Sequence, residues 1–278
     1  MNKRLSWALS TVIGVLAAGL GVAAPAQAMV RATPDTVRTA VGSFWAQFGS
    51  GRPFFICSGT FVSETVFVTA SHCVDYIVRY GGNASVSLAD AFPADGSPPA
   101  DLVPAEAHLN PRYKESNGTD LYQFDVSVLT VAAMPQHEGQ VTPASLPGAR
   151  LLDGLKASGG LRGAVFTVAG YGTESMVVDP VGPGTSPTSF PDTGLRQSGL
   201  LGFGALGASV LHENQRANAG YAGAGYGDSG GPSFLGTSNT IVGVTSTGDI
   251  PCYATNTAYR LDTAEARDFL GQFVALPQ

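Results

Sequence analysis

The sequence predicts a mostly β protein, rich in loops, with one helix at its C-terminus. Only 13% of its 278 residues are charged, and it contains 36 glycines and 18 prolines. This composition is typical of short strands joined by many turns, and it argues against a helical bundle or a disordered chain. Near the C-terminus, Ala266, Phe269, Leu270 and Phe273 follow helical spacing, which predicts an amphipathic helix over residues 262–274.

Residues 1–28 have the features of a secretory signal. Lys3 and Arg4 give it a positive start, an apolar stretch follows, and Ala26-Gln27-Ala28 fits the small-x-small cleavage pattern. No later stretch reaches the roughly 18 apolar residues of a membrane-spanning helix. We therefore expect a chain that begins at Met29 and is secreted, to the extracellular space or to a periplasm, without a membrane partner. An uncleaved anchor is the alternative interpretation.

The charge pattern excludes one class of partner. The formal net charge is −6 and the basic residues are not clustered, so the chain lacks a surface that could neutralise nucleic-acid phosphates. The four histidines are scattered, without an H-E-x-x-H motif or cysteine pairs at zinc spacing, so neither a metal nor another cofactor is expected. The sequence does not indicate an oligomeric state.

Runs of β-branched and aromatic residues, bounded by turn formers, predict the strands in order along the chain. They lie at residues 54–57, 59–62, 66–70, 125–131, 164–172, 199–211 and 240–246. The Pro- and Gly-rich segments 89–104 and 176–198 are expected to be loops. Residues 29–40 carry no strand pattern, and the connecting segment 132–163 fits a domain boundary.

Export permits disulfides, and the chain has three cysteines, Cys57, Cys73 and Cys252. Cys57 and Cys73 bracket a predicted hairpin and are the expected pair, worth roughly 3 kcal/mol for a loop of this size. His72 directly follows the last strand of that hairpin, beside Cys73. The disulfide would hold the imidazole in place, as a catalytic base requires. A surface histidine in a turn is the alternative.

The segment Gly227-Asp228-Ser229-Gly230-Gly231-Pro232 has the composition of a nucleophile turn. Its glycines allow a sharp turn close to a substrate, and a serine hydroxyl becomes a nucleophile when a base removes its proton. Backbone N–H groups in such a turn can stabilise the oxyanion that forms. A glycine-rich surface turn with an idle serine is the alternative.

Chain order selects the partners of Ser229. All four histidines precede it, which excludes the Ser…Asp…His order of α/β-hydrolases. The order Asp…His…Ser does not fit, because no suitable acid precedes His72. The order His…Asp…Ser remains, with Asp125 at the start of a predicted strand, where an aspartate is unusual and needs a partner. Alternatively Asp125 faces water on an edge strand; Asp120 is the close competitor and lies in a turn.

Three segments resemble the signature blocks of chymotrypsin-like (trypsin-like) serine proteases. They are Thr69-Ala70-Ser71-His72-Cys73, Asp125-Val126-Ser127-Val128-Leu129 and the nucleophile turn at 227–232. The resemblance implies an all-β fold of two six-stranded antiparallel β-barrels packed together, with a C-terminal α-helix. The expected division is a signal peptide at 1–28, an N-terminal segment or pro-segment at 29–40, an N-terminal barrel at 41–145, and a C-terminal barrel with its helix at 146–278.

The resemblance also implies the roles of the reacting residues. His72 would be general base and then general acid, Asp125 would hold its tautomer, and Ser229 would attack the peptide carbonyl. The N–H groups of Gly227 and Ser229 would form the oxyanion hole.

Substrate contacts follow from the same resemblance. The segment Ser246-Thr247-Gly248 would pair with the substrate backbone, with Thr247 in place of the tryptophan usual in the family. Gly223 stands where an acid would bind Arg or Lys, so with Gly248 on the wall we expect an open pocket for apolar or mid-sized side chains. Cys252 matches one half of the family's pocket disulfide, yet Gly225 stands at its partner's position.

Asp228 corresponds to the family's aspartate that pairs with a new N-terminus made by cleavage. The chain lacks the Ile-Val-Gly-Gly sequence of such a site, and Arg31 and Arg38 are poor matches. We therefore expect Asp228 to pair with an internal group, without an activating cut.

Together these features predict a secreted serine endopeptidase that hydrolyses protein or peptide substrates through an acyl-enzyme. Two alternatives remain open at this point. One is a catalytically silent binding protein on the same fold, and the other is an esterase that uses the same triad.

Overall fold

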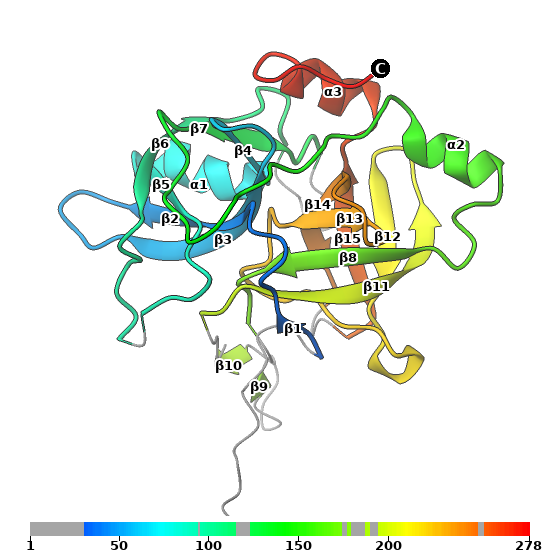
Figure 1. The fold of residues 1–278 in the computed structure, drawn as a ribbon, viewed down its shortest axis with the longest axis horizontal. Coiled ribbons are helices and arrows are strands. Elements are labelled where there is room, and N and C mark those ends of the chain that lie inside the picture. Colours follow the sequence, from blue (N-terminus) through cyan, green and yellow to red (C-terminus); the bar gives the residue numbers. More distant parts are fainter. Residues whose placement is uncertain are drawn as a thin grey trace, which may run out of the picture.

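The structure is a computed structural model that describes residues 31–93, 95–114, 123–173, 177–178, 187–189, 194–249 and 253–278. The predicted signal at 1–28, Asp120 and Cys252 lie outside these residues. The described chain forms two closed six-stranded antiparallel barrels, which confirms the predicted fold (Figure 1). None of its helices has the length and apolar character needed to cross a bilayer.

The first barrel is closed in the order β2-β3-β4-β7-β6-β5 by pairing between β2 and β5. Its strands are β2 (Val41–Gln47), β3 (Phe54–Phe61), β4 (Val66–Thr69), β5 (Asn83–Ser87), β6 (Val103–His108) and β7 (Ser127–Thr130). The two separate strands predicted within 54–62 are therefore one strand. Its β-branched and aromatic side chains, which suit a pleated surface, fill the barrel together with those of β4.

The second barrel is closed in the order β8-β11-β12-β15-β14-β13 by pairing between β13 and β8. Its strands are β8 (Val165–Gly170), β11 (Gln197–Leu206), β12 (Val210–Asn214), β13 (Pro232–Leu235), β14 (Ile241–Gly248) and β15 (Thr255–Arg260). The run at 199–211, predicted as one or two short strands, falls in two strands, β11 and β12. A short pair, β9 (Val177–Val178) and β10 (Pro187–Ser189), forms a separate two-stranded sheet.

The N-terminal segment is part of the second barrel's wall. The short strand β1 (Thr33–Pro34) pairs with β11. Ala32, just before it, is fully buried in a cluster with Val168, Leu201, Ala222 and Ala224. Residues 31–40 thus include a strand that pairs with the second barrel and a fully buried alanine, which local propensity alone does not reveal.

The described residues include three α-helices, of which sequence patterning predicted only the last. They are α1 (Ser71–Tyr80), α2 (Leu151–Ala157) and α3 (Ala264–Leu270), and a 3₁₀ turn covers Ala217–Ala219. α3 is shorter than the predicted 262–274. Its N-cap is Thr263, whose hydroxyl accepts the N–H of Ala266 at 3.3 Å, as expected for a threonine cap.

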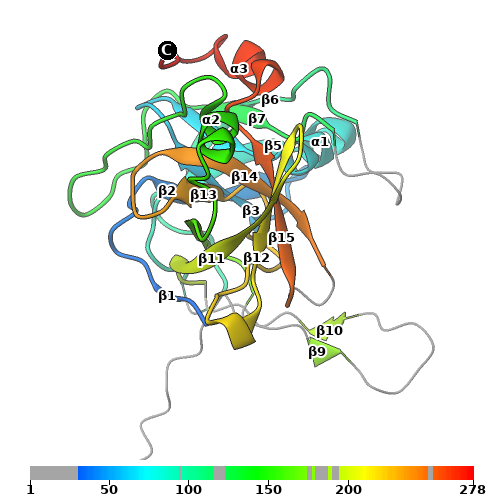
Figure 2. The same ribbon diagram turned by 90° about the vertical axis from the view of Figure 1, so that its right-hand side faces the viewer.

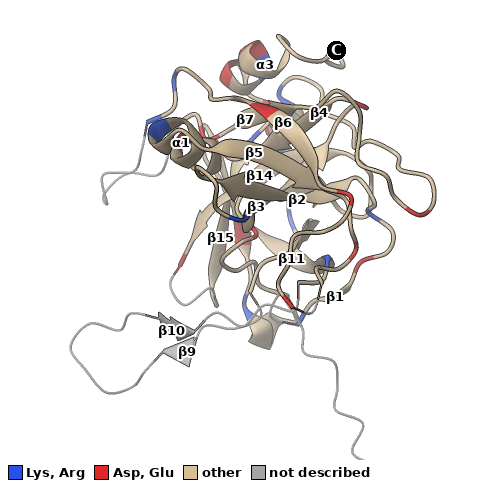
Figure 3. Cartoon of the chain, turned by 90° about the vertical axis from the view of Figure 1, so that its left-hand side faces the viewer, with Lys and Arg blue, Asp and Glu red and all other residues tan. Residues whose placement is uncertain are grey.

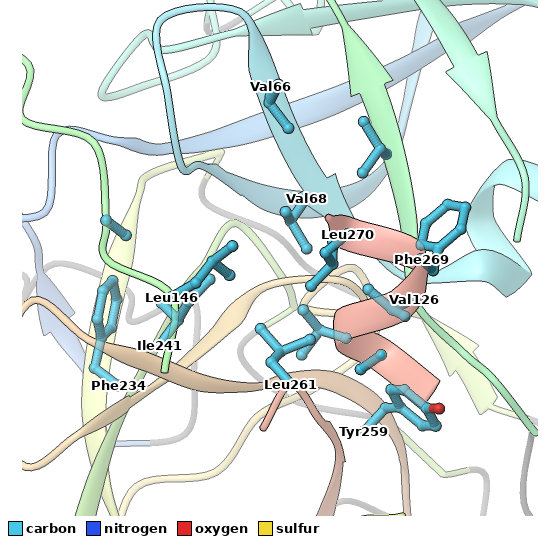
Figure 4. Close-up of a cluster of buried hydrophobic side chains, with 14 of the residues drawn as sticks. Val66, Val68, Val126, Leu146, Phe234, Ile241, Tyr259, Leu261, Phe269 and Leu270 are labelled. Carbon is cyan, nitrogen blue, oxygen red and sulfur yellow. The ribbon is translucent and has the colours of Figure 1, made fainter. Parts of the chain in front are cut away.

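A shared hydrophobic cluster fixes the two barrels against each other. Figure 4 shows its members: Val66, Val68 and Val126 from the first barrel, Ile241 and Tyr259 from the second, and Phe269 and Leu270 from α3. Figures 1 and 2 both place α3 at the end of the molecule where β7 lies. The helix therefore covers the junction between the barrels, and its packing stabilises their relative position.

A buried arginine links the N-terminal segment to the loop after the first barrel's β5. The Arg196 guanidinium is 1% exposed and donates to the carbonyls of Asp35 at 3.0 Å and of Val41 and Leu88 at 3.3 Å each. It also pairs with the Asp90 carboxylate. The remaining charged residues of the described chain are sparse on the strands and scattered over loops and helix ends (Figure 3).

Replacement of Arg196 by alanine is expected to lower the free energy of unfolding by roughly 3–5 kcal/mol, because its buried acceptors would lose their donor. Chemical denaturation measures this loss. Arg162→Ala, at an exposed position, is the matched control and should change stability by about 0.5 kcal/mol or less. Equal effects of the two substitutions would contradict the linking role of Arg196.

Candidate active site

His72 lies in the first turn of α1, immediately after β4 ends. Its backbone N–H donates to Asp125 Oδ1 at 2.9 Å, and its Nδ1 lies 3.0 Å from Asp125 Oδ2. Cys73, the next residue, forms a disulfide with Cys57 of β3. The imidazole is thus held by a backbone bond, a side-chain bond and a covalent link beside it, which is the support that a precisely aimed base needs.

Asp125 is fully buried just before β7. Besides the two bonds from His72, its Oδ2 accepts the hydroxyl of Ser246, from β14 of the other barrel. The preceding residue, Phe124, has a left-handed backbone with φ of 55°, and its carbonyl accepts the Ser71 hydroxyl at 3.0 Å. These bonds fix the direction of the carboxylate, so its oxygens point at the imidazole.

The nucleophile turn brings Ser229 into the junction between the barrels. Gly227 and Gly230 have φ values of 94° and 79°, which favour glycine. Ser58 of β3 holds the carbonyls of this turn, since its N–H donates to Ser229 O at 2.9 Å and its hydroxyl to Gly227 O at 2.8 Å. Within the described residues, the N–H groups of Gly227 and Ser229 donate to no acceptor. These two donors are therefore available to an oxyanion.

His72 and Ser229 border one cavity of about 430 Å³. Gly227 and the segment Ser246-Thr247-Gly248 border it as well. The structure thus brings together the residues predicted for the reaction, the oxyanion hole and substrate pairing. Gly223 is the exception, because it is buried and only its neighbour Ala224 reaches the cavity.

Sequence reasoning missed two polar residues that border the cavity, Asp249 and Asn256. Asp249 directly follows Gly248, the last residue of the segment predicted to pair with substrate. This position was the only indication in the sequence that Asp249 borders the cavity. Asn256 lies in β15, a strand that the sequence did not predict. The cavity wall is therefore more polar than the expected pocket for apolar side chains.

Asp228 is buried beneath the nucleophile turn. Its carboxylate accepts the N–H groups of Gly225 at 2.7 Å and of Gly172 at 2.9 Å. Burial raises the pKa of this carboxyl to about 7, although the two backbone hydrogen bonds oppose the rise. The internal groups that bind Asp228 are thus backbone amides, and no cationic side chain in the described ranges forms an ion pair with it.

The free energy of unfolding is expected to fall as the pH rises from about 4 to about 7. The folded pKa of Asp228 lies above the unfolded value of 3.8, so the folded state binds the proton more tightly and this stabilisation is lost on ionisation. Denaturation across this pH range should show a shallower fall in Asp228→Asn. Asp75→Asn, at a partly exposed acid, is the control. Parallel pH curves for wild type and Asp228→Asn would contradict the assignment.

Comparison with known proteins places these features in context. Residues 34–267 match the family described as Trypsin. Among solved structures, the chain is similar to one titled "HL collagenase structure at 1.7 Å resolution", with 17% identity, a TM-score of 0.61, and coverage of 87% of this chain and 97% of that chain. At this identity the likeness concerns the fold alone. No curated protein sequence matches the chain.

Proposed function

Because the chain belongs to the trypsin family of serine proteases, we propose that it is a secreted endopeptidase acting through His72, Asp125 and Ser229. One observation carries the proposal. The His72 imidazole, bonded to buried Asp125 at 3.0 Å, borders the same cavity as Ser229. A fixed base and a serine in a glycine turn are the two components that acyl transfer requires.

In the proposed reaction, His72 Nε2 takes the proton of the Ser229 hydroxyl as the oxygen attacks the carbonyl carbon of the scissile peptide bond. The N–H groups of Gly227 and Ser229 donate to the oxyanion of the tetrahedral intermediate. The imidazolium then gives its proton to the leaving amine, and an acyl-enzyme remains. Water, deprotonated by the same imidazole, releases the acid and restores Ser229.

Asp125 serves this reaction by position and charge. Its bond to Nδ1 leaves Nε2 of His72 as the basic nitrogen, and its carboxylate stabilises the imidazolium that forms. The Ser246 hydroxyl, bonded to the same carboxylate oxygen, keeps the carboxylate from turning away. Both barrels therefore contribute to the orientation of a single imidazole.

Substrates of this enzyme are proteins or peptides. The end of β14, Ser246-Thr247-Gly248, would lie along the substrate backbone, and Gly248 leaves room beside it. With Gly223 where an acid would bind Arg or Lys, the pocket is not directed to basic side chains. The chain is exported after cleavage of residues 1–28, and its catalytic part consists of a barrel at 41–145 and a second at 146–278.

A fluorophosphonate probe, which reacts with activated serines, is expected to label the protein, and Ser229→Ala should abolish the labelling. His72→Ala should slow labelling and peptide hydrolysis by roughly 10⁴-fold or more, because the serine loses its base. Ser158→Ala, at an exposed hydroxyl, is the matched control and should react as wild type does. Turnover of esters without peptides would favour an esterase, and no labelling would favour a silent binding protein.

The chain from Met29 onward is expected to be active without further cleavage, because backbone N–H groups already bind Asp228. The double variant Arg31→Gln/Arg38→Gln removes both candidate cleavage points. Its kcat/KM on a peptide substrate should stay within about threefold of the wild-type value. A protein that is inert until it is cut at Arg31 or Arg38 would refute this expectation.

A further inference from the structure

Behind the cavity wall lies a buried acid that the proposed reaction does not use. Glu213 of β12 is fully buried. Its Oε2 accepts the amide of Asn256 at 2.7 Å and the hydroxyl of Ser233 at 3.1 Å. Its Oε1 has no hydrogen-bond partner among the described residues. A buried carboxyl with an unpaired oxygen is costly for the fold, so its presence calls for an explanation.

Asn256 separates this acid from the cavity. It borders the cavity, is 2% exposed, and pairs with Glu213 across the β12–β15 ladder. Glu213 itself is not among the residues that border the cavity. The uncharged side chain of Asn256 therefore lies between the cavity and the buried carboxyl of Glu213.

The bond to Glu213 also fixes which way the Asn256 amide points. Its Nδ2 donates to Glu213 Oε2, so Oδ1 is directed elsewhere. In the described part of the chain no donor reaches this Oδ1, and it is not among the buried polar atoms that lack a partner. The carbonyl oxygen of Asn256, a residue that borders the cavity, is therefore an acceptor without a donor among the described residues.

We propose that Asn256, held by Glu213, selects the substrate side chain that enters this cavity, favouring uncharged side chains with an N–H or O–H donor. Asparagine, threonine and serine have such donors at a size that a mid-sized pocket accepts. This inference rests on the proposed peptidase function. It replaces a general expectation of apolar side chains by a defined hydrogen bond to Asn256 Oδ1.

Asp249 is the one acid of the described residues that borders this cavity, and it is bonded to neighbouring parts of the chain. The Asp249 carboxylate already accepts four donors, which hold the chain between β14 and β15. They are the Gln215 amide and the N–H groups of Tyr253, Ala254 and Thr255. Three of these donors bond Oδ1 and one bonds Oδ2, so the direction of the carboxylate is fixed by its own chain.

Peptides that differ only at the residue before the scissile bond test the proposal in the wild-type enzyme. Two pairs have matched shapes, asparagine with leucine and threonine with valine. The donor-bearing member of each pair should show a kcat/KM about tenfold higher or more, as expected for one hydrogen bond to a buried acceptor. Faster cleavage after leucine and valine, or after arginine and lysine, would overturn the proposal.

Two variants test whether Asn256 selects the side chain and separates Glu213 from the cavity. Asn256→Gly removes the carboxamide and opens the cavity onto Glu213. The asparagine–leucine difference should shrink to within about twofold, and cleavage after lysine and arginine should rise about tenfold or more because a carboxylate becomes accessible. Adding Glu213→Gln should remove that rise. Asn239→Gly, at an exposed turn, is the control and should keep the wild-type preference. An unchanged preference in Asn256→Gly would overturn the proposal.

Labelling of Ser229 by a fluorophosphonate, which carries no peptide side chain, separates the possible failures. A wild-type enzyme that is labelled but shows no preference within the matched pairs overturns this inference and leaves the peptidase function standing. A protein that is neither labelled nor active overturns both. If a variant loses labelling through misfolding, the matched pairs in the wild type still decide.

Discussion

The geometry of the site depends on one buried serine between the barrels. Ser58 belongs to β3 of the first barrel, yet it donates to the carbonyls of Ser229 and Gly227 in the second. Its hydroxyl also accepts the N–H of Tyr171 at 3.0 Å. The same strand carries Cys57, which is bonded to the residue after His72. One strand thus positions both His72 and Ser229, so their separation does not depend on distant loops.

Hydrogen bonds of this kind aim the reacting groups only when the barrels cannot move apart. The shared hydrophobic cluster and α3 supply that constraint, since apolar packing is strong but without direction. The polar contacts add direction. Some of these polar contacts involve ionisable groups in the interior, namely those of Arg196, Asp228 and Glu213. Arg196 and Asp228 are satisfied by backbone groups or side chains, whereas Oε1 of Glu213 has no partner among the described residues.

The sequence singled out His72, Asp125 and Ser229 because each lies in a short segment with a recognisable composition, and the structure places His72 beside Asp125 and on the same cavity as Ser229. The glycines around Ser229 and the half-cystine beside His72 are local signals. α1 was missed because its short amphipathic pattern follows a strand directly, and α2 was missed within a Pro- and Gly-rich connection. The position of Asn256 in the cavity wall could not be predicted from the sequence. Its place depends on the register of β15 with β12, and on Glu213, which is distant in sequence.

Ala32, near the N-terminal end of the described chain, packs behind the wall of the cavity. Ala32 packs in the same cluster as Ala224, and Ala224 borders the cavity. Removal of the N-terminus past this alanine would therefore leave a void behind the cavity wall. The shape of this cavity would then depend on the residue at which the chain begins.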